Sequence, residues 1–316
     1  MDYLTNIRVD EMDIEKYHTL DSYIDEIKPD DLQQIIRSLI EISLDVPKQI
    51  LTFLLGENDY SGTLNLSGDE QLSLDIATQE LFLQRMPNNL YSLLLGEETH
   101  EENIMIGTGE FIILGDFIDG SSIIRCRSPG AIVNIIDKKG HTVAALTVSY
   151  TLFLRFDLAT DLGFIQFVHD GHEFRVVKDN LNISPSKSPV FGLGGKYNDH
   201  SAKEKLFVDA LDIKGKNRYG GCMVQDMNNV FEKTGVFGYF APKLRFCYEI
   251  IPYLYILSKV NGDGFYITAD GHEIKYADIK PLDVHKLTSL HYLHQRAGFV
   301  GGSKDLIELW FKVDAL

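Results

Sequence analysis

The feature that most constrains the fold is a series of short apolar runs between residues 110 and 177, each about as long as a β-strand. The runs cover residues 110–114, 130–136, 144–156, 164–168 and 173–177. Glycine-centred polar segments at 139–141 and 170–172 separate some of them, which is typical of turns. This part of the chain is therefore predicted to be rich in β-strands.

Earlier in the chain, apolar residues are spaced as in a helix. Apolar residues recur at steps of three and four between residues 30 and 55, which predicts a helix with one buried face. Asp30 or Asp31 is the expected N-cap, and Pro47 is expected to break or restart the helix. Residues 1–28 predict a short helix or arm, and residues 74–95 predict a second amphipathic helix that runs into a strand.

The second half of the chain alternates between helical and strand patterns. Residues 182–189 contain two prolines and three serines and form the best candidate linker. Beyond it, strands are predicted at 189–193 and 235–240, and helices at 223–233, 248–260 and 304–311. The chain of 316 residues is thus predicted to have mixed α and β structure in layers, with domains at 1–183 and 184–316.

Composition narrows the possible partners and the location. The net charge of -16 opposes binding to nucleic acid and to anionic membranes, because both are polyanions. The three cysteines show no metal-type spacing and predict free thiols in a reducing compartment. Neither a signal peptide nor an apolar run of about 18 residues is evident. We expect a cytoplasmic protein.

Four acidic clusters are candidates for metal binding. They are Asp69 and Glu70 with Asp75, then Glu97 and Glu98, then Asp116 and Asp119, and finally Glu249. Two acids three residues apart at the end of a strand can turn toward one cavity, and the Ile118 carbonyl between them can add an oxygen ligand. Each cluster alone is more often a solvated face or a turn, but their order beside apolar runs points to a site with two or three metal ions.

The segment D-F-I-D-G-S-S at residues 116–122 resembles the D-P-x-D-G-[ST] signature of lithium-sensitive, magnesium-dependent phosphatases. Segments beginning at Asn65, Gly96, Arg218, Gly235, Lys243 and His294 are similar, in the same order, to motifs of class I fructose-1,6-bisphosphatases. The resemblance runs from about residue 30 to the C-terminus. It implies the sugar phosphatase fold, a five-layer α-β-α-β-α sandwich, of the α/β (α+β layered) class.

The resemblance also implies residue roles. Asp75 and Glu98 would orient and deprotonate the attacking water. Asp69 would be a third catalytic residue. The metal ligands would be Asp69, Glu97, Asp116, the Ile118 carbonyl, Asp119 and Glu249, holding Mg²⁺ or Mn²⁺. Substrate would contact Asp119, Gly120, Ser121, Ser122, Gly194, Tyr197, Arg218, Tyr219, Tyr239, Lys243, Leu244 and Arg245. The family forms dimers and tetramers, so a homodimer or homotetramer is expected, in which Arg218 reaches a neighbouring subunit's site.

The implied activity is the hydrolysis of fructose 1,6-bisphosphate to fructose 6-phosphate and phosphate, in gluconeogenesis or sugar-phosphate cycling. The alternatives are a phosphatase for another sugar bisphosphate, such as sedoheptulose 1,7-bisphosphate, and a catalytically silent homologue that serves as an interaction protein. The retained carboxylates argue against a silent homologue, because crowded charges are costly to keep.

Three departures from the family pattern stand out. Phe117 replaces the signature proline but leaves each ligand in place, so a small effect is expected. Gly194 stands where the family has an asparagine that donates to the distal phosphate, which leaves the choice of substrate open. At the positions that bind AMP in regulated members, this chain has Pro29, Glu110, Phe111 and Asp137, and the acids predict no inhibition by AMP.

Overall fold

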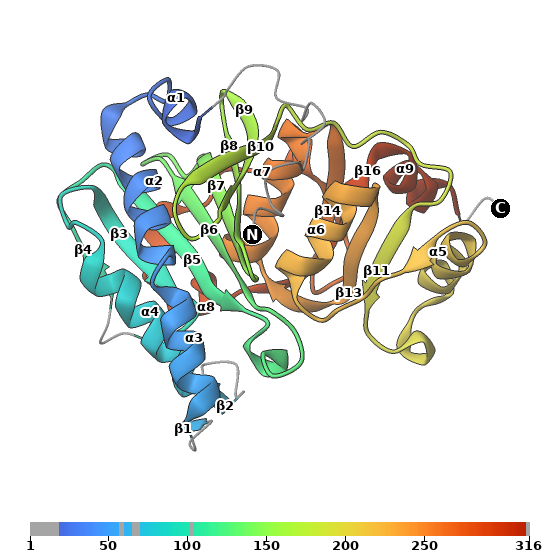
Figure 1. Cartoon of the computed structure of the whole chain (residues 1–316). Helices are drawn as coiled ribbons and strands as arrows, with labels where there is room; N and C mark the ends of the chain where they lie inside the picture. The colour runs from blue at the N-terminus through green and yellow to red at the C-terminus, as the bar shows by residue number, and fades with distance from the viewer. Residues whose placement is uncertain (1–18, 57–59, 65–69, 101–103, 314–316) are drawn as a thin grey trace.

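The computed structural model describes residues 19–56, 60–64, 70–100 and 104–313. In it, helices and sheets alternate in five layers: helices, an eight-stranded sheet, two helices, a six-stranded sheet and outer helices (Figure 1). Three buried apolar clusters fill the spaces between these layers. The predicted five-layer α-β-α-β-α sandwich is confirmed.

Four helices from the N-terminal part form the first layer. They are α1 (Leu20–Ile24), α2 (Asp30–Ser43), α3 (Val46–Leu55) and α4 (Ser73–Arg85). The apolar stripe of α2 is buried as predicted, but Pro29 is its N-cap and Asp30 is already helical, so the predicted cap was wrong. Pro47 lies in the first turn of α3, where its missing N–H costs nothing, and this confirms the restart.

The eight-stranded sheet has the order β10-β9-β8-β7-β6-β5-β3-β4. Its strands are β3 (Tyr91–Gly96), β4 (Met105–Ile106), β5 (Phe111–Asp119), β6 (Gly130–Ile136), β7 (Thr142–Tyr150), β8 (Leu154–Thr160), β9 (Gly163–His169) and β10 (Phe174–Asp179). The run predicted at 144–156 is two strands, because the chain turns between them. Leu152 and Phe153 are exposed in that turn, so hydrophobicity alone concealed it. A separate small sheet pairs β1 (Tyr60–Leu64) with β2 (Glu70–Leu72).

The six-stranded sheet has the order β12-β11-β13-β16-β14-β15. Its strands are β11 (Val190–Gly194), β12 (Lys216–Asn217), β13 (Gly235–Arg245), β14 (Gly262–Ile267), β15 (Glu273–Lys275) and β16 (Arg296–Ser303). β11 and β13 are parallel, whereas β13 and β16 are antiparallel. The sequence analysis did not predict β14 or β16, because their several glycines interrupt the alternation that indicates a strand.

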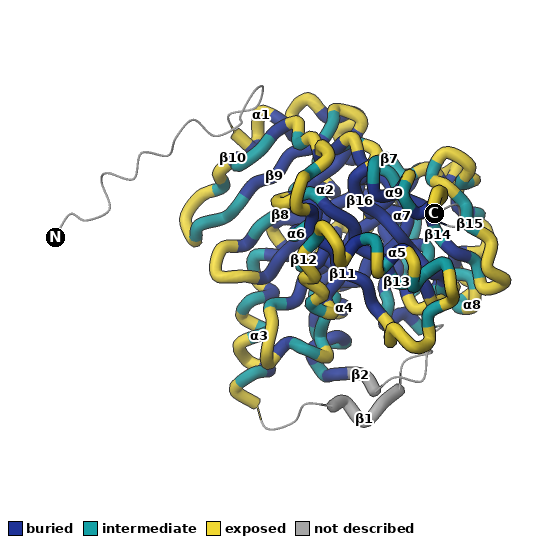
Figure 2. Tube along the Cα trace, turned by 90° about the vertical axis from the view of Figure 1, so that its right-hand side faces the viewer, coloured by how far each residue is buried: buried dark blue, intermediate teal, exposed yellow. Residues whose placement is uncertain are grey.

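The helices α6 (Met223–Lys233) and α7 (Ile251–Lys259) lie between the two sheets, and a π-helical turn at Phe246–Ile250 leads into α7. Figure 2 shows α7 and the neighbouring strand β16 as buried. The core around these helices combines Ile132 and Phe164 of the first sheet with Phe237 and Phe299 of the second. Because both halves of the chain share this core, the boundary near residue 183 stays a prediction.

On the outer face of the six-stranded sheet, α5 (Ala202–Asp212) and α9 (Lys304–Lys312) pack around the buried Trp310. The sequence analysis predicted α9 but not α5. A short helix, α8 (Leu290–Leu293), precedes β16. Within the described ranges, no helix combines the length and apolar character needed to cross a bilayer.

Candidate active site

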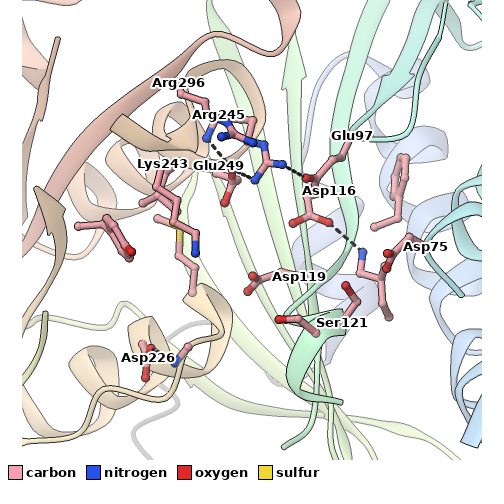
Figure 3. A pocket seen from close by; sticks show the side chains of 18 of the residues that line it. Asp75, Glu97, Asp116, Asp119, Ser121, Asp226, Lys243, Arg245, Glu249 and Arg296 are labelled. Carbon is pink, nitrogen blue, oxygen red and sulfur yellow. Dashed lines mark hydrogen bonds and ion pairs between the residues drawn. The ribbon is translucent and has the colours of Figure 1, made fainter. Parts of the chain in front are cut away.

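A cavity of about 590 Å³ lies between the two sheets, where β3, β5 and β13 end. One wall comes from α4, β3 and β5, and the other comes from β13, β16 and the segment before α6. Figure 3 shows Asp75, Asp116 and Asp119 on the first wall, opposite Lys243 and Arg296. Acidic and basic side chains therefore face each other across a space that is large enough for a small phosphorylated molecule.

Most of the predicted site residues line this cavity. They are Asp75, Glu97, Glu98, Asp116, Ile118, Asp119, Gly120, Ser121, Ser122, Tyr219, Tyr239, Lys243, Leu244, Arg245 and Glu249. Asp69 lies outside the described residues. The roles of these side chains in catalysis or binding stay predictions.

Three of the predicted substrate contacts do not line the cavity. Gly194 is buried at the end of β11, beneath two tyrosine rings. The Tyr197 hydroxyl donates to Asp209 of α5, 2.9 Å away, so this side chain is held on the outer side of the molecule. Arg218 is exposed and donates to the Asn217 carbonyl at 3.2 Å. A direct substrate contact by Gly194 or Tyr197 is therefore not supported within one chain.

The end of β5 arranges two carboxylates by local hydrogen bonds. Asp116 Oδ1 accepts the Ile118 N–H at 3.0 Å, and Asp119 Oδ2 accepts the Val224 N–H at 2.8 Å. The Cys222 thiol also donates to Asp119 Oδ2 at 3.1 Å. Gly120 then turns the chain with φ +82, and a Cβ there would lie 2.8 Å from the Cys222 Cβ. Glycine is thus required both by the left-handed backbone and by the close approach of α6.

Burial and like charge disfavour ionisation of these carboxylates. The pKa of Asp119 is raised to about 6, mainly by burial. The pKa of Glu249 is raised to about 8, again mainly by burial, although the nearby Arg245 opposes the shift. Burial and then the charges of Glu97, Asp119 and Glu249 hold the pKa of Asp116 well above its usual range. Such a group of buried acids is stabilised only when a cation neutralises it.

Arg245 is the cation within this group. Its guanidinium forms an ion pair with Glu97 and lies 3.9 Å from Glu249, whose carboxylate also accepts the Arg245 backbone N–H at 2.5 Å. Burial alone would lower the pKa of Arg245, but the charges of Glu97 and Glu249 raise it well above its ordinary value. Arg245 therefore stays charged and offsets part of the acidic charge.

The oxygen donors of the cavity suit a hard divalent cation. Among the described residues, no three acidic, histidine or cysteine side chains stand close enough together to form a metal-binding group. The chemistry of the cavity nevertheless fits a hard divalent cation, since Asp116, Asp119 and Glu249 bring buried carboxylate oxygens with raised pKa values to its lining. The predicted ligands therefore match Mg²⁺ or Mn²⁺ in chemical type.

A second pair of acids lies at the start of α4 and the end of β3. Asp75 is in the first turn of α4, and its Oδ2 accepts the Leu72 N–H at 3.2 Å. Burial raises the pKa of Asp75 to about 7, hydrogen bonding by Ser121 limits the rise, and the charge of Glu97 adds to it. The Glu98 backbone N–H donates to Gln79 Oε1 at 2.9 Å, which fixes the turn that follows β3. Asp75 thus has the pKa of a proton acceptor that works near neutral pH.

The sequence analysis missed several residues that line the cavity. They include Gln79, Gly221, Met223, Asp226, Phe237 and Arg296. Asp226 accepts the N–H groups of Gly220 and Gly221 at 2.7 and 3.1 Å, and so holds the segment that carries Tyr219. Arg296 adds a cation to the lining of the cavity, whereas Arg218 does not line it. Asp226 and Arg296 lie in segments that resemble family motifs. This resemblance is the sequence signal that could have identified them.

Comparison with known proteins identifies relatives along nearly the whole chain. The family model "Fructose-1-6-bisphosphatase, N-terminal domain" matches residues 11–170, and "Fructose-1-6-bisphosphatase, C-terminal domain" matches residues 184–313. A class 1 fructose-1,6-bisphosphatase of Haloarcula marismortui is 27% identical over 87% of this chain and 92% of its own length. One from Campylobacter concisus is 27% identical over 89% of this chain and 98% of its own.

Solved structures show the same architecture. The holo form of a Leishmania major fructose-1,6-bisphosphatase superposes with a TM-score of 0.80 at 22% identity. The superposition covers 96% of this chain and 100% of the other. At this level of identity, the likeness establishes the fold.

Proposed function

This chain belongs to the fructose-1,6-bisphosphatase family, and we propose that it hydrolyses the 1-phosphate of fructose 1,6-bisphosphate in a metal-dependent reaction. The proposal rests on one observation. One cavity has buried carboxylates on one wall and Lys243, Arg245 and Arg296 on the other. An acidic wall can hold cations at the reacting phosphate, while a basic wall can bind a second phosphate. A sugar bisphosphate fits this arrangement, because one of its two phosphates can meet the bound cations and the other the basic side chains.

The metal would be held by Glu97, Asp116, Asp119, Glu249 and the Ile118 carbonyl, with Asp69 as a further ligand. Magnesium is the proposed ion and manganese a substitute, because both prefer carboxylate oxygens. When bound, such ions neutralise charge on the phosphate and make water a stronger nucleophile.

The proton from the attacking water is assigned to Asp75, with Glu98 helping to orient the water. Asp75 carries the pKa of about 7 described above, so a large fraction is deprotonated at neutral pH and can accept a proton. Ser121 and Ser122 line the cavity in the turn after Gly120 and would contact the reacting phosphate. Asp75 is buried in the first turn of α4, and its side chain lines the cavity.

The sugar and its distal phosphate are assigned to the opposite wall. Tyr219, Tyr239 and Lys243 line that wall, and Lys243 Nζ lies 5.3 Å from the centre of the Tyr239 ring. Arg245 and Arg296 add positive charge there. This local cationic group lets a protein of net charge -16 bind an anion.

Assembly and location are part of the proposal. The exposed Arg218 is available to a neighbouring subunit's site in a homodimer or homotetramer. We place the protein in the cytoplasm, in gluconeogenesis or sugar-phosphate cycling.

The test is phosphate release from fructose 1,6-bisphosphate with Mg²⁺, with EDTA, and with the variant Asp119→Asn. We expect release that needs the metal and that falls at least about 100-fold in the variant, as for loss of a group that stabilises transition-state charge. The matched control is Asp278→Asn, an exposed aspartate outside the cavity, which should keep full activity. Release that persists in EDTA, or in Asp119→Asn, would contradict the proposal.

Sedoheptulose 1,7-bisphosphate is a second candidate substrate, and Gly194 favours it. With no side chain at this position, this chain lacks the asparagine that donates to the distal phosphate in the family, so the position of that phosphate is less restricted to fructose 1,6-bisphosphate. Phosphate release from this sugar but not from fructose 1,6-bisphosphate would establish the second candidate. No release from either, with a folded protein, would favour the catalytically silent homologue.

A further inference from the structure

Gly194 is the last residue of β11, and it pairs with Tyr239 in the parallel ladder between β11 and β13. Paired residues on neighbouring strands point to the same face of a sheet, and the Tyr239 side chain lines the cavity. A Cβ on Gly194 would lie 2.1 Å from Tyr239 Cδ2 and 2.3 Å from its Cε2. The Tyr239 ring therefore fills the space that any side chain at position 194 would need.

The position on the other side of Tyr239 in the sheet is also occupied by an aromatic residue. On its other side, Tyr239 pairs with Phe299 of β16, whose side chain is 0% exposed. A side chain at position 194 would therefore push the ring outward, into the cavity. Lys243 Nζ, 5.3 Å from the ring centre, and the Tyr219 hydroxyl, 3.0 Å from the same Cβ position, would have to move with it.

We propose that Gly194 is a positioning residue for substrate binding, a role that rests on the proposed sugar bisphosphatase function. Its missing side chain lets Tyr239 lie against β11, and this sets both the room at the distal end of the cavity and the place of Lys243. Gly194 thus acts by avoiding a clash with the Tyr239 ring, and not only by lacking a hydrogen-bond donor. Restoring the family's asparagine should accordingly weaken binding.

The chain offers a matched control on the same strand. Gly192 lies two residues earlier on the same face of β11, and a Cβ there would meet its nearest neighbours, Phe237 and Tyr219, at 3.5 Å. That distance is ordinary van der Waals contact. Neither glycine has a positive φ, so alanine at either position tests the side chain and not the backbone. The comparison is Gly194→Ala and Gly194→Asn against Gly192→Ala.

We expect Gly194→Ala and Gly194→Asn to raise the KM for fructose 1,6-bisphosphate about tenfold with little change in kcat, the pattern of lost ground-state binding. The Kd for fructose 6-phosphate, measured by calorimetry with Mg²⁺ present, should rise by a similar factor. Gly192→Ala should leave both constants unchanged. In a Tyr239→Leu background, Gly194→Ala should add no further loss, since the clashing ring is gone.

Three results would overturn the inference. The first is equal KM values for Gly194→Ala and Gly192→Ala, and the second is tighter binding by Gly194→Asn, which would restore the hydrogen-bond explanation. The third is a Gly194→Ala effect that persists in the Tyr239→Leu background, which would reject the role of the ring. Failure of the proposed function is a separate outcome, because it would appear as no phosphate release by the unmodified protein.

Discussion

Arg245 of β13 and Glu97 beside β3 form an ion pair that joins the two sheets across the cavity. Their side chains are 12% and 19% exposed, so the pair is largely withdrawn from water. Glu97 also adds to the negative charge around Asp116, whose pKa is raised by burial and by this charge. The ion pair therefore compensates charge in the interior and also holds the two walls of the cavity at a fixed separation.

Removing this cation should destabilise the fold. In Arg245→Met, the carboxylates of Glu97 and Glu249 lose their partner, and we expect a loss of about 2–3 kcal/mol in the free energy of unfolding. The measurement is urea denaturation in EDTA. Lys312→Met is the control, because its pair with Glu308 is exposed and should be worth less than about 0.5 kcal/mol. Equal losses in the two variants would contradict the structural role of Arg245.

Part of one wall of the cavity was predictable from sequence because it is local. Asp116 and Asp119 come from one strand end, and their spacing alone brings them together. The contact between the two walls was not predicted, because Arg245 and Glu97 are far apart in the sequence and meet through the order of strands. Arg296 was not named as a site residue, although it lies in the segment beginning at His294 that resembles a family motif.

Phe117 illustrates how packing can change the expected effect of a substitution. Its replacement of the signature proline was expected to matter little, because no ligand is lost. Phe117, however, is only 3% exposed. Its ring stacks on that of Phe82, with the ring centres 4.3 Å apart, and so packs β5 against α4. The aromatic residue thus has a packing role in this chain that a comparison of ligands did not reveal.

We therefore expect Phe117→Pro, which restores the family signature, to lower the free energy of unfolding by about 3 kcal/mol, as for loss of a large buried side chain. Thermal and urea denaturation would measure the change. Leu152→Ala, at a side chain that is 91% exposed, should change stability by no more than about 0.5 kcal/mol. If Phe117→Pro is as stable as the unmodified protein, the ring contributes less than its contacts indicate.

The absence of AMP inhibition stays a prediction that rests on Glu110 and Asp137. Glu110 forms an ion pair with Lys138, and Asp137 Oδ1 accepts the N–H groups of Lys139 and His141 at 2.8 and 2.9 Å. These contacts engage both acids within the protein, and neither acid can bind a nucleotide phosphate as a cation would. We expect AMP to leave phosphate release unchanged. Inhibition by AMP that disappears in Phe111→Leu would show that the site is retained.

His294 should make the fold sensitive to mild acid. Its Nδ1 is 2.9 Å from the Tyr248 hydroxyl and its Nε2 is 3.4 Å from the Thr99 carbonyl. Burial lowers the pKa of His294 from 6.5 to about 4, although the hydrogen bond to Thr99 opposes this shift. The unfolded chain therefore binds a proton between pH 6.5 and pH 4 that the folded protein does not bind, so stability is complete above pH 6.5 and falls as the pH decreases.

The decrease in pKa from 6.5 to about 4 corresponds to a loss of about 3 kcal/mol over this range. Urea denaturation at several pH values would measure it, with His294→Gln as the variant that cannot titrate and His172→Gln, at an exposed turn, as the control. Other groups contribute equally to all three profiles, so the difference between profiles isolates His294. The His294→Gln profile should be flatter by about 3 kcal/mol, and the His172→Gln profile should follow that of the unmodified protein. Parallel profiles for all three proteins would show that His294 titrates alike in the folded and unfolded states.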